Sequence, residues 1–88
     1  MSEDQELLEF PCEFPVKIMG RDTDAFRAAA VGIVETHAGP VSEAAVRSRA
    51  SRDGNFHALT ITIRATSRAQ LDSIYSALSA HEDIIMAL

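Results

Sequence analysis

The chain has 88 residues, of which 47% are hydrophobic and 24% charged, and its formal net charge at pH 7 is −5. This balance is typical of one globular domain with one core and excludes a disordered tail. No apolar run is long enough to cross a membrane, the N-terminus lacks the positive region of a secretory signal, and a single cysteine excludes an internal disulfide. We therefore expect a cytoplasmic protein.

The charge is concentrated at the N-terminus. Residues 1–12 are predicted to be an acidic leader segment, and residues 13–88 a single domain. From Phe14 onward eight acidic residues balance eight basic ones, so the folded body is neutral. A neutral body argues against general affinity for nucleic acids, which requires a surplus of Lys and Arg to displace counterions from phosphates.

The first strand and the first helix are predicted from two different periodicities. Side chains alternate from Phe14 to Met19 until Gly20 stops the run, which favours a strand. A helix follows, because Thr23 or Asp22 can cap it and Gly39-Pro40 can end it. Its apolar stripe is Phe26, Ala30, Ile33 and Val34, and its small residues Ala28, Ala29 and Gly32 predict close packing.

The second and third strands are predicted as a hairpin. Residues 43–51 form a weakly apolar run that is typical of an edge strand. Asp53-Gly54 favours a tight turn, because both residues tolerate positive φ. Between Phe56 and Ala65 apolar and polar residues alternate, which predicts a strand with one buried face.

A second helix and a last strand complete the chain. Ser67 and Gln70 form a capping box at the start of the helix. Residues 84–88 are β-prone and predict the last strand. The apolar stripe of the helix is formed by Leu71, Ile74, Tyr75 and Leu78.

The order β-α-β-β-α-β predicts an α+β, ferredoxin-like sandwich. With right-handed crossovers, two helices cover one face of a four-stranded sheet, and the first and third strands are central. The expected core is Val16, Ile18, Phe26, Ile33, Val46, Leu59, Ile61, Ile63, Leu71, Ile74, Leu78, Ile84 and Met86.

Several segments of the chain resemble the YbeD-like proteins of proteobacteria. This resemblance implies a fold similar to regulatory domains of the ACT type, a side-by-side homodimer, and no established enzymatic activity. The segments that carry it are 7–11, 17–20, 54–57, 60–63, 65–66, and the closing Met86 and Leu88.

The face of the sheet that the helices leave uncovered is the predicted binding surface. Its mixture of cations and hydroxyls suits a small anionic metabolite or an acidic protein partner, because Arg binds a carboxylate through two hydrogen bonds. The alternative is a solvated face kept charged to prevent aggregation. A further hypothesis is that the acids Glu3, Asp4, Glu6 and Glu9 shield this face. The residues predicted for the uncovered face are Lys17, Met19, Arg47, Arg49, Thr60, Thr62 and Arg64.

Other functions receive less support from the residues. The chain carries no phosphate-binding glycine loop, no nucleophile elbow and no metal-binding spacing, so we expect no enzyme, no cofactor and no metal site. His57 is predicted to lie at the boundary of the core. Modules that bind RNA share this topology but stack bases on aromatic residues of the central strands, where this chain has Lys, Met and Thr. A non-catalytic regulatory or adaptor domain is the predicted function, and an RNA-binding module is the alternative.

Overall fold

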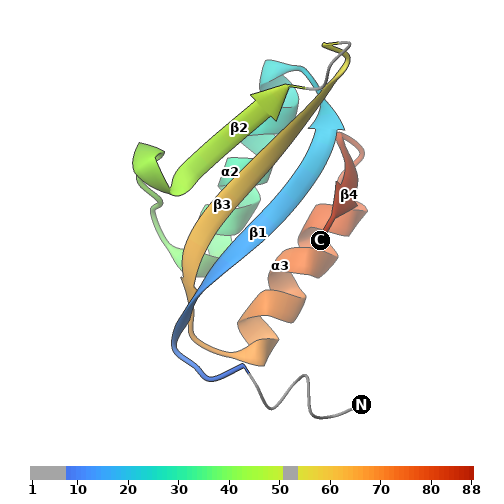
Figure 1. The fold of residues 1–88 in the computed structure, drawn as a ribbon. Helices are drawn as coiled ribbons and strands as arrows, with labels where there is room; N and C mark the ends of the chain where they lie inside the picture. The colour runs from blue at the N-terminus through green and yellow to red at the C-terminus, as the bar shows by residue number, and fades with distance from the viewer. Residues whose placement is uncertain (1–7, 51–53) are drawn as a thin grey trace.

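The order of the elements agrees with the predicted one. A computed structural model describes residues 8–50 and 54–88 of the chain. Helices and strands alternate as β-α-β-β-α-β, with one short 3-10 turn before the second strand (Figure 1). The elements are β1 (Cys12–Arg21), α2 (Asp24–Ala38), η1 (Glu43–Ala45), β2 (Val46–Ala50), β3 (Phe56–Ala65), α3 (Arg68–Ala80) and β4 (Ile84–Ala87).

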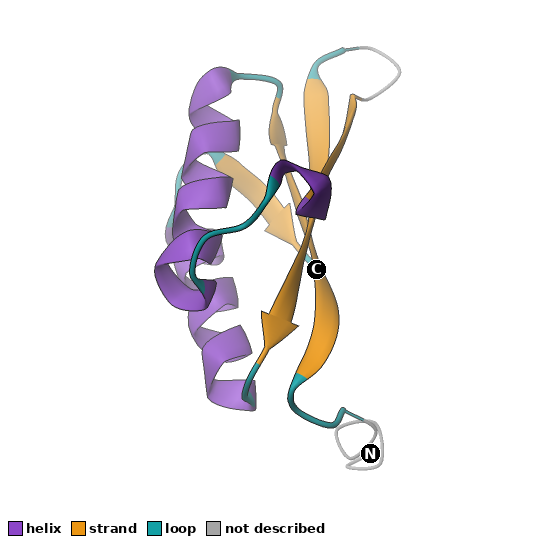
Figure 2. Ribbon diagram, turned by 90° about the vertical axis from the view of Figure 1, so that its left-hand side faces the viewer, coloured by secondary structure: helices purple, strands orange, loops and turns teal. Residues whose placement is uncertain are grey.

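The four strands form one antiparallel sheet in the order β2-β3-β1-β4. The first and third strands are central, as predicted, and pair along their whole length from Cys12 opposite Ala65 to Arg21 opposite Phe56. Both helices lie on the same side of the sheet (Figure 2). Neither helix lies on the other side, and this confirms the ferredoxin-like arrangement.

Both helices begin at the predicted caps. The Thr23 hydroxyl accepts a hydrogen bond from the Phe26 N–H at 3.0 Å, and the Ser67 hydroxyl accepts one from the Gln70 N–H at 3.0 Å. Gly39 ends α2 with φ of 83°, a conformation that favours glycine. The predicted turn at Asp53-Gly54 lies partly outside the described residues.

Strand boundaries differ from the prediction in β1, in β2 and in β4, which ends at Ala87. Glu43–Ala45 is a 3-10 turn and not the start of the second strand, which begins at Val46. The predicted end at Ser51 lies outside the described residues. β1 is longer than predicted and starts at Cys12, because the full length of β3 is available to pair with it.

Ten of the thirteen residues predicted for the core are buried, and Ala30, Val34 and Ala65 are buried in addition. Val46 is half-buried because it lies on the edge strand, beyond the cover of the helices, and Ile33 is half-buried because Phe26, Ala30 and Val34 form the inner stripe of α2. Met86 is 47% exposed. The buried residues are Val16, Ile18, Phe26, Ala30, Val34, Leu59, Ile61, Ile63, Ala65, Leu71, Ile74, Leu78 and Ile84.

Close approach occurs at a different glycine from the one predicted. Gly32 of α2 is exposed, and a Cβ added there would meet no atom within 4 Å, so the expectation of tight packing was wrong. Gly20 of β1 is buried, and a Cβ added there would overlap the Phe26 ring and approach the Asp83 carbonyl oxygen. The end of β1 therefore packs against α2 and the turn before β4 at a distance that only glycine allows.

Candidate functional site

The uncovered side of the sheet, called the open face below, carries all seven residues predicted for it. The strand register places Arg47, Thr60 and Lys17 side by side on β2, β3 and β1. The next row contains Arg49, Ala58 and Met19. Thr62 and Arg64 continue the same face of β3, because side chains two residues apart point to the same side of a strand. The sequence therefore placed seven residues of β1, β2 and β3 correctly on this face.

The cations of the open face have no carboxylate partner within 4.0 Å among the described residues. The ion pairs found there are His57–Asp22, Arg68–Asp72 and His81–Asp83. Arg21, which lies opposite Phe56, adds a further exposed cation that the prediction omitted. The strand register also places one acidic residue, Glu13, on this side, opposite Arg64. The face is therefore positively charged although the chain as a whole is acidic. Its cations are Lys17, Arg21, Arg47, Arg49 and Arg64.

An apolar strip that the sequence did not predict lies beside these cations. In the pairing of β4 with β1, Gly20 lies opposite Ile84 and Met19 lies opposite Met86, so Ile85 is an extra residue that forms a bulge. Strict alternation from Ile84 would bury Met86 and Leu88, whereas the bulge moves both to the open face. The apolar strip comprises Met19, Phe56, Ala58, Met86 and Leu88.

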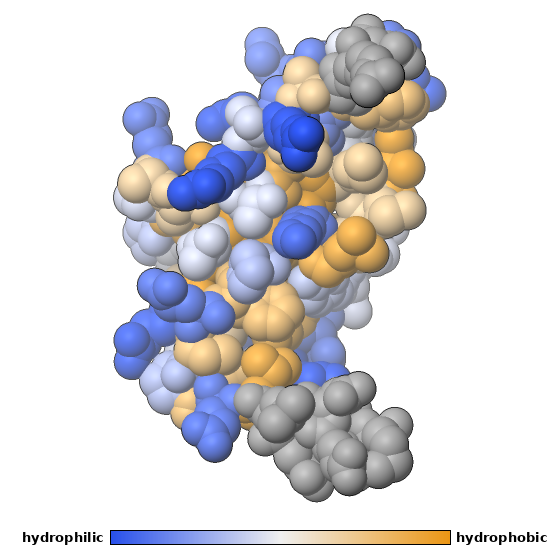
Figure 3. All heavy atoms as spheres, viewed as in Figure 1, coloured by the Kyte–Doolittle hydropathy of each residue, from blue (hydrophilic) through white to orange (hydrophobic). Residues whose placement is uncertain are grey.

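The large side chains of the strip are exposed. Met19 is 43% exposed, Met86 47% and Leu88 68%. In the space-filling view of this face, hydrophobic spheres are visible over β1 and β4, and hydrophilic spheres over β2 (Figure 3). Exposed apolar patches rimmed by polar groups mark interaction surfaces more often than isolated apolar residues do.

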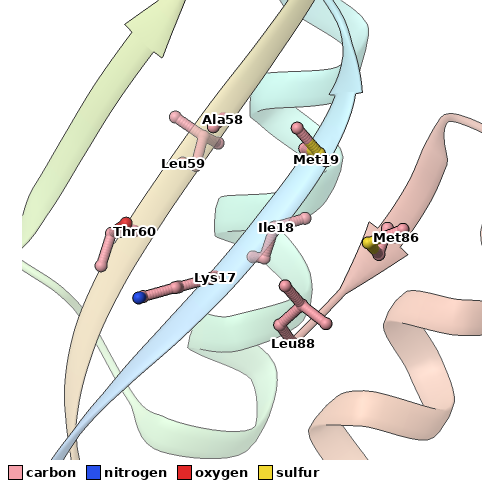
Figure 4. Close-up of a pocket in the computed structure, with 8 residues that line it drawn as sticks. All are labelled: Lys17, Ile18, Met19, Ala58, Leu59, Thr60, Met86 and Leu88. Atoms are coloured by element: carbon pink, nitrogen blue, oxygen red, sulfur yellow. The ribbon is translucent and has the colours of Figure 1, made fainter.

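The strip contains a shallow hollow. Met19, Met86 and Leu88 form one wall, and Lys17, Ala58 and Thr60 continue it across β1 and β3 (Figure 4). Its volume is about 190 Å³. Pockets that enclose a small molecule usually measure roughly 300–1,000 Å³. The hollow therefore has room for one or two side chains of another molecule.

Hydrogen bonds to the backbone fix Leu88 beside β1. The Leu88 N–H donates to the Lys17 carbonyl at 2.7 Å, and the Lys17 N–H donates to the Leu88 carbonyl at 3.2 Å. The same Leu88 carbonyl accepts a hydrogen bond from the Tyr75 hydroxyl of α3 at 2.5 Å. Burial raises the pKa of Tyr75 above its ordinary value. Tyr75 thus ties the end of the chain, and one wall of the hollow, to the second helix.

The titratable side chains on the covered side form no further site in the described residues. His57 is half-buried at the boundary of the core, as predicted, and its Nδ1 lies 3.1 Å from Asp22 Oδ1. Its Nε2 is buried without a hydrogen-bond partner. Residues 8–50 and 54–88 contain no group of three or more His, Cys, Asp or Glu side chains placed to hold a metal. Of the acids predicted to shield the open face, Glu3, Asp4 and Glu6 lie outside the described residues.

In the described part of the chain, neither α2 nor α3 has the length and apolar character that a membrane-spanning helix needs.

The architecture defines the class of this protein as a ferredoxin-like α+β domain with an uncovered sheet face. The solution structure of protein HP0495 from H. pylori has the same fold, with a TM-score of 0.66 over 92% of this chain and 85% of that chain, at 14% sequence identity. The chain belongs to the family described as "Protein of unknown function (DUF493)", whose model matches residues 5–88. This confirms the resemblance found in the sequence.

Bacterial proteins of similar length are similar to this chain in sequence. A UPF0250 protein of Chromobacterium violaceum is 49% identical over 86 residues, which cover 98% of this chain and 97% of that protein. A UPF0250 protein of Nitrosomonas europaea is 44% identical over 85 residues, covering 97% and 98% respectively. The matched segments cover 97–98% of this chain.

Proposed function

We propose that this protein is a non-catalytic adaptor domain that binds a protein partner on its open face. The observation that supports the proposal is the position of the apolar strip directly beside cations that have no carboxylate partner within 4.0 Å in residues 8–50 and 54–88. Apolar side chains of a partner would cover Met19, Met86 and Leu88, while its carboxylates would meet Arg47 and Arg49. An apolar centre with a polar rim is the usual arrangement of a protein interface.

The distribution of the cations favours a protein over a small anionic metabolite. Arg47 and Arg49 lie on β2, Arg64 on β3, and Lys17 and Arg21 on β1, so they are spread across three strands. A small ligand contacts only a few convergent polar groups inside a pocket. The hollow on this face is lined mainly by apolar atoms and is small for such a ligand. A surface of this breadth suits a partner with its own extended surface.

RNA is the other candidate for a positively charged sheet face. Base recognition on such sheets depends on stacking against aromatic side chains. The central rows of this face carry Lys17, Thr60, Met19 and Ala58 instead, and Phe56 is the first residue of β3. The composition of the strip therefore favours side chains of a protein over bases. The homodimer and the cytoplasmic location expected from the sequence stay predictions.

Site-specific photo-cross-linking in living cells tests the proposal. A benzophenone amino acid replaces Met19 on the open face in one variant and Ala28, an exposed residue of α2, in the control. Mass spectrometry then identifies the adducts. We expect a defined protein adduct from position 19 that is absent from position 28. Arg49→Glu should reduce the yield of this adduct at least several-fold, whereas Arg27→Glu on α2 should leave it unchanged.

Three outcomes would contradict the proposal. Equal adducts from positions 19 and 28 would mean that the open face has no preference for a partner. A nucleic-acid adduct at position 19 would replace the protein partner with RNA. The absence of any adduct at position 19, in cells where the variant is folded and as abundant as the wild type, would leave the face without a macromolecular partner.

A further inference from the structure

The edge strand β2 lacks the cover that the other strands have. Its principal contacts are with β3 and with η1, whereas the helices pack on β1, β3 and β4. Ser48 lies opposite Leu59, so its side chain points to the helix side of the sheet, yet it is exposed while Leu59 is buried. Residues 47–50 are all exposed. Both faces of β2 and its outer edge are therefore accessible.

The direction of the peptide groups in β2 follows from the register. The two hydrogen bonds between Lys17 and Leu88 show that the peptide groups of Lys17 point to β4. Thr60 is the partner of Lys17 on β3, so its peptide groups point the other way, to β2, where Thr60 lies opposite Arg47. Consequently Arg47 and Arg49 direct their peptide groups to β3. Val46, Ser48 and Ala50 direct theirs outward.

The Val46 N–H agrees with this direction, because it donates to the Glu43 carbonyl in η1 and so does not point to β3. By alternation, the N–H and C=O of Ser48 point to the outer edge of the sheet. No strand lies beyond β2 in the described residues. Ser48 is therefore the centre of an edge that can pair with another strand.

The side chains of β2 decide which strand fits this edge. Arg47 and Arg49 lie on the open face, two residues apart, and neither takes part in an ion pair of the described residues. If two copies paired through β2 in an antiparallel manner, each register that pairs the outward peptide group of Ser48 with that of Val46, Ser48 or Ala50 would place arginine opposite arginine. Like charges directly opposite each other are destabilising. The edge therefore disfavours a second copy and favours a strand with acidic residues at alternate positions.

We infer that β2 accepts an extended acidic segment of a protein partner, which adds antiparallel to the sheet with carboxylates opposite Arg47 and Arg49. This inference rests on the proposed function, since the carboxylates lie on the open face, and it specifies the mode of binding. Main-chain hydrogen bonds to Ser48 supply affinity, and the alternate carboxylates supply specificity. Antiparallel addition continues the pairing of the whole sheet.

Synthetic peptides test this inference on the intact protein. The probe is a short blocked peptide with Glu at every second position and Thr or Val between. A control peptide has the same composition with its glutamates grouped at one end. We expect the alternating peptide to bind at least tenfold more tightly, to shift the amide resonances of Ser48 and Ala50, and to slow hydrogen exchange at Ser48.

Backbone methylation separates strand addition from charge attraction. Residues opposite Arg47 and Arg49 point their own N–H groups away from β2, and the residues between them point toward it. N-methylation of the Thr and Val positions should therefore abolish binding, and N-methylation of the Glu positions should leave it nearly unchanged. Equal binding of both methylated peptides would overturn the inference. It would mean that the peptide contacts the arginines of the open face without adding a strand to the sheet. No binding of the unmethylated peptide would overturn it as well.

A variant of the protein gives the reciprocal test. Ser48→Pro removes the outward N–H but leaves Arg47 and Arg49 in place, and proline is tolerated at an edge where the N–H faces solvent. We expect loss of peptide binding in Ser48→Pro and its retention in Ser48→Ala. Retained binding in a folded Ser48→Pro variant would contradict the inference. If that variant does not fold, the methylated peptides decide the question with the unmodified protein. Cross-linking at position 19 tests the proposed function separately, because it detects a partner on the open face whether or not that partner adds a strand to β2.

Discussion

Met19 of β1 and Met86 of β4 lie directly opposite each other on the open face, each with more than two fifths of its surface exposed. The pair exists because Ile85 is bulged out of the ladder. Without the bulge Met86 would point to the helices and Ile85 would lie opposite Met19. The bulge therefore decides which side chains of β4 reach the open face, which are Met86 and Leu88 in place of Ile85 and Ala87.

Substitutions in β4 should distinguish the two faces of the sheet. Ile84→Ala removes a buried side chain from the core and should lower the free energy of unfolding by about 2–4 kcal/mol. Met86→Ala, only two residues away, should lower it by less than about 1 kcal/mol because Met86 is exposed. Urea denaturation measures both. A loss at Met86 as large as the loss at Ile84 would show that the register of β4 is the alternating one, in which both side chains are buried.

Adding a methyl group at Gly20 should destabilise the fold. In Gly20→Ala the new Cβ overlaps the Phe26 ring, and neither the ring nor the Asp83 backbone can move without disturbing the core. We expect the free energy of unfolding to fall by about 1–3 kcal/mol. Combining it with Phe26→Leu, which makes room beside β1, should give a smaller loss than the sum of the two single changes. Strict additivity would mean that the two sites do not touch.

The same substitution at Gly32 should have the opposite effect. Gly32 lies within α2 and is exposed, and a Cβ there meets nothing within 4 Å. Gly32→Ala should therefore raise the free energy of unfolding by about 1 kcal/mol, because alanine has the higher helix propensity. Gly39→Ala is the matched control, since its φ of 83° strains any other residue and should make the protein less stable. Thermal unfolding followed by circular dichroism measures both changes.

Tyr75 should make stability depend on alkaline pH. Because burial raises its pKa in the folded state, the unfolded chain loses the phenol proton first as the pH rises. The stability that Tyr75 contributes is fully present below the unfolded pKa of about 10 and falls as the pH rises through the folded pKa. Tyr75→Phe should cost about 1 kcal/mol at neutral pH through loss of the hydrogen bond to Leu88.

The test for Tyr75 is direct because the chain contains one tyrosine and no tryptophan. Ultraviolet absorbance reports the phenolate of this residue alone, so its titration in the folded protein gives the shift. Urea denaturation across the alkaline range should show a declining free energy of unfolding in the wild type and a flatter profile in Tyr75→Phe. Identical profiles would contradict the role assigned to this hydroxyl.

Much of the fold follows from local patterns in the sequence. The alternation of Leu59, Ile61 and Ile63 places β3 and defines its buried face, and the caps at Thr23 and Ser67 place both helices. These signals are strong because each depends on neighbours along the chain. The order of the elements then restricts the topology to a few arrangements, and the residues of the open face on β1, β2 and β3 follow from the same alternation.

The sequence by itself determined the order of the elements, the helix caps and the alternating faces of β1 and β3. Only the tertiary structure decided that Met86 and Leu88 belong to the open face, that Gly20 and not Gly32 is the point of close approach, and that Ser48 is exposed on the helix side. The physical reason is the same in each case. A bulge, an overlap with Phe26 and the limit of helix cover depend on how distant segments meet, and no repeat along the chain encodes that.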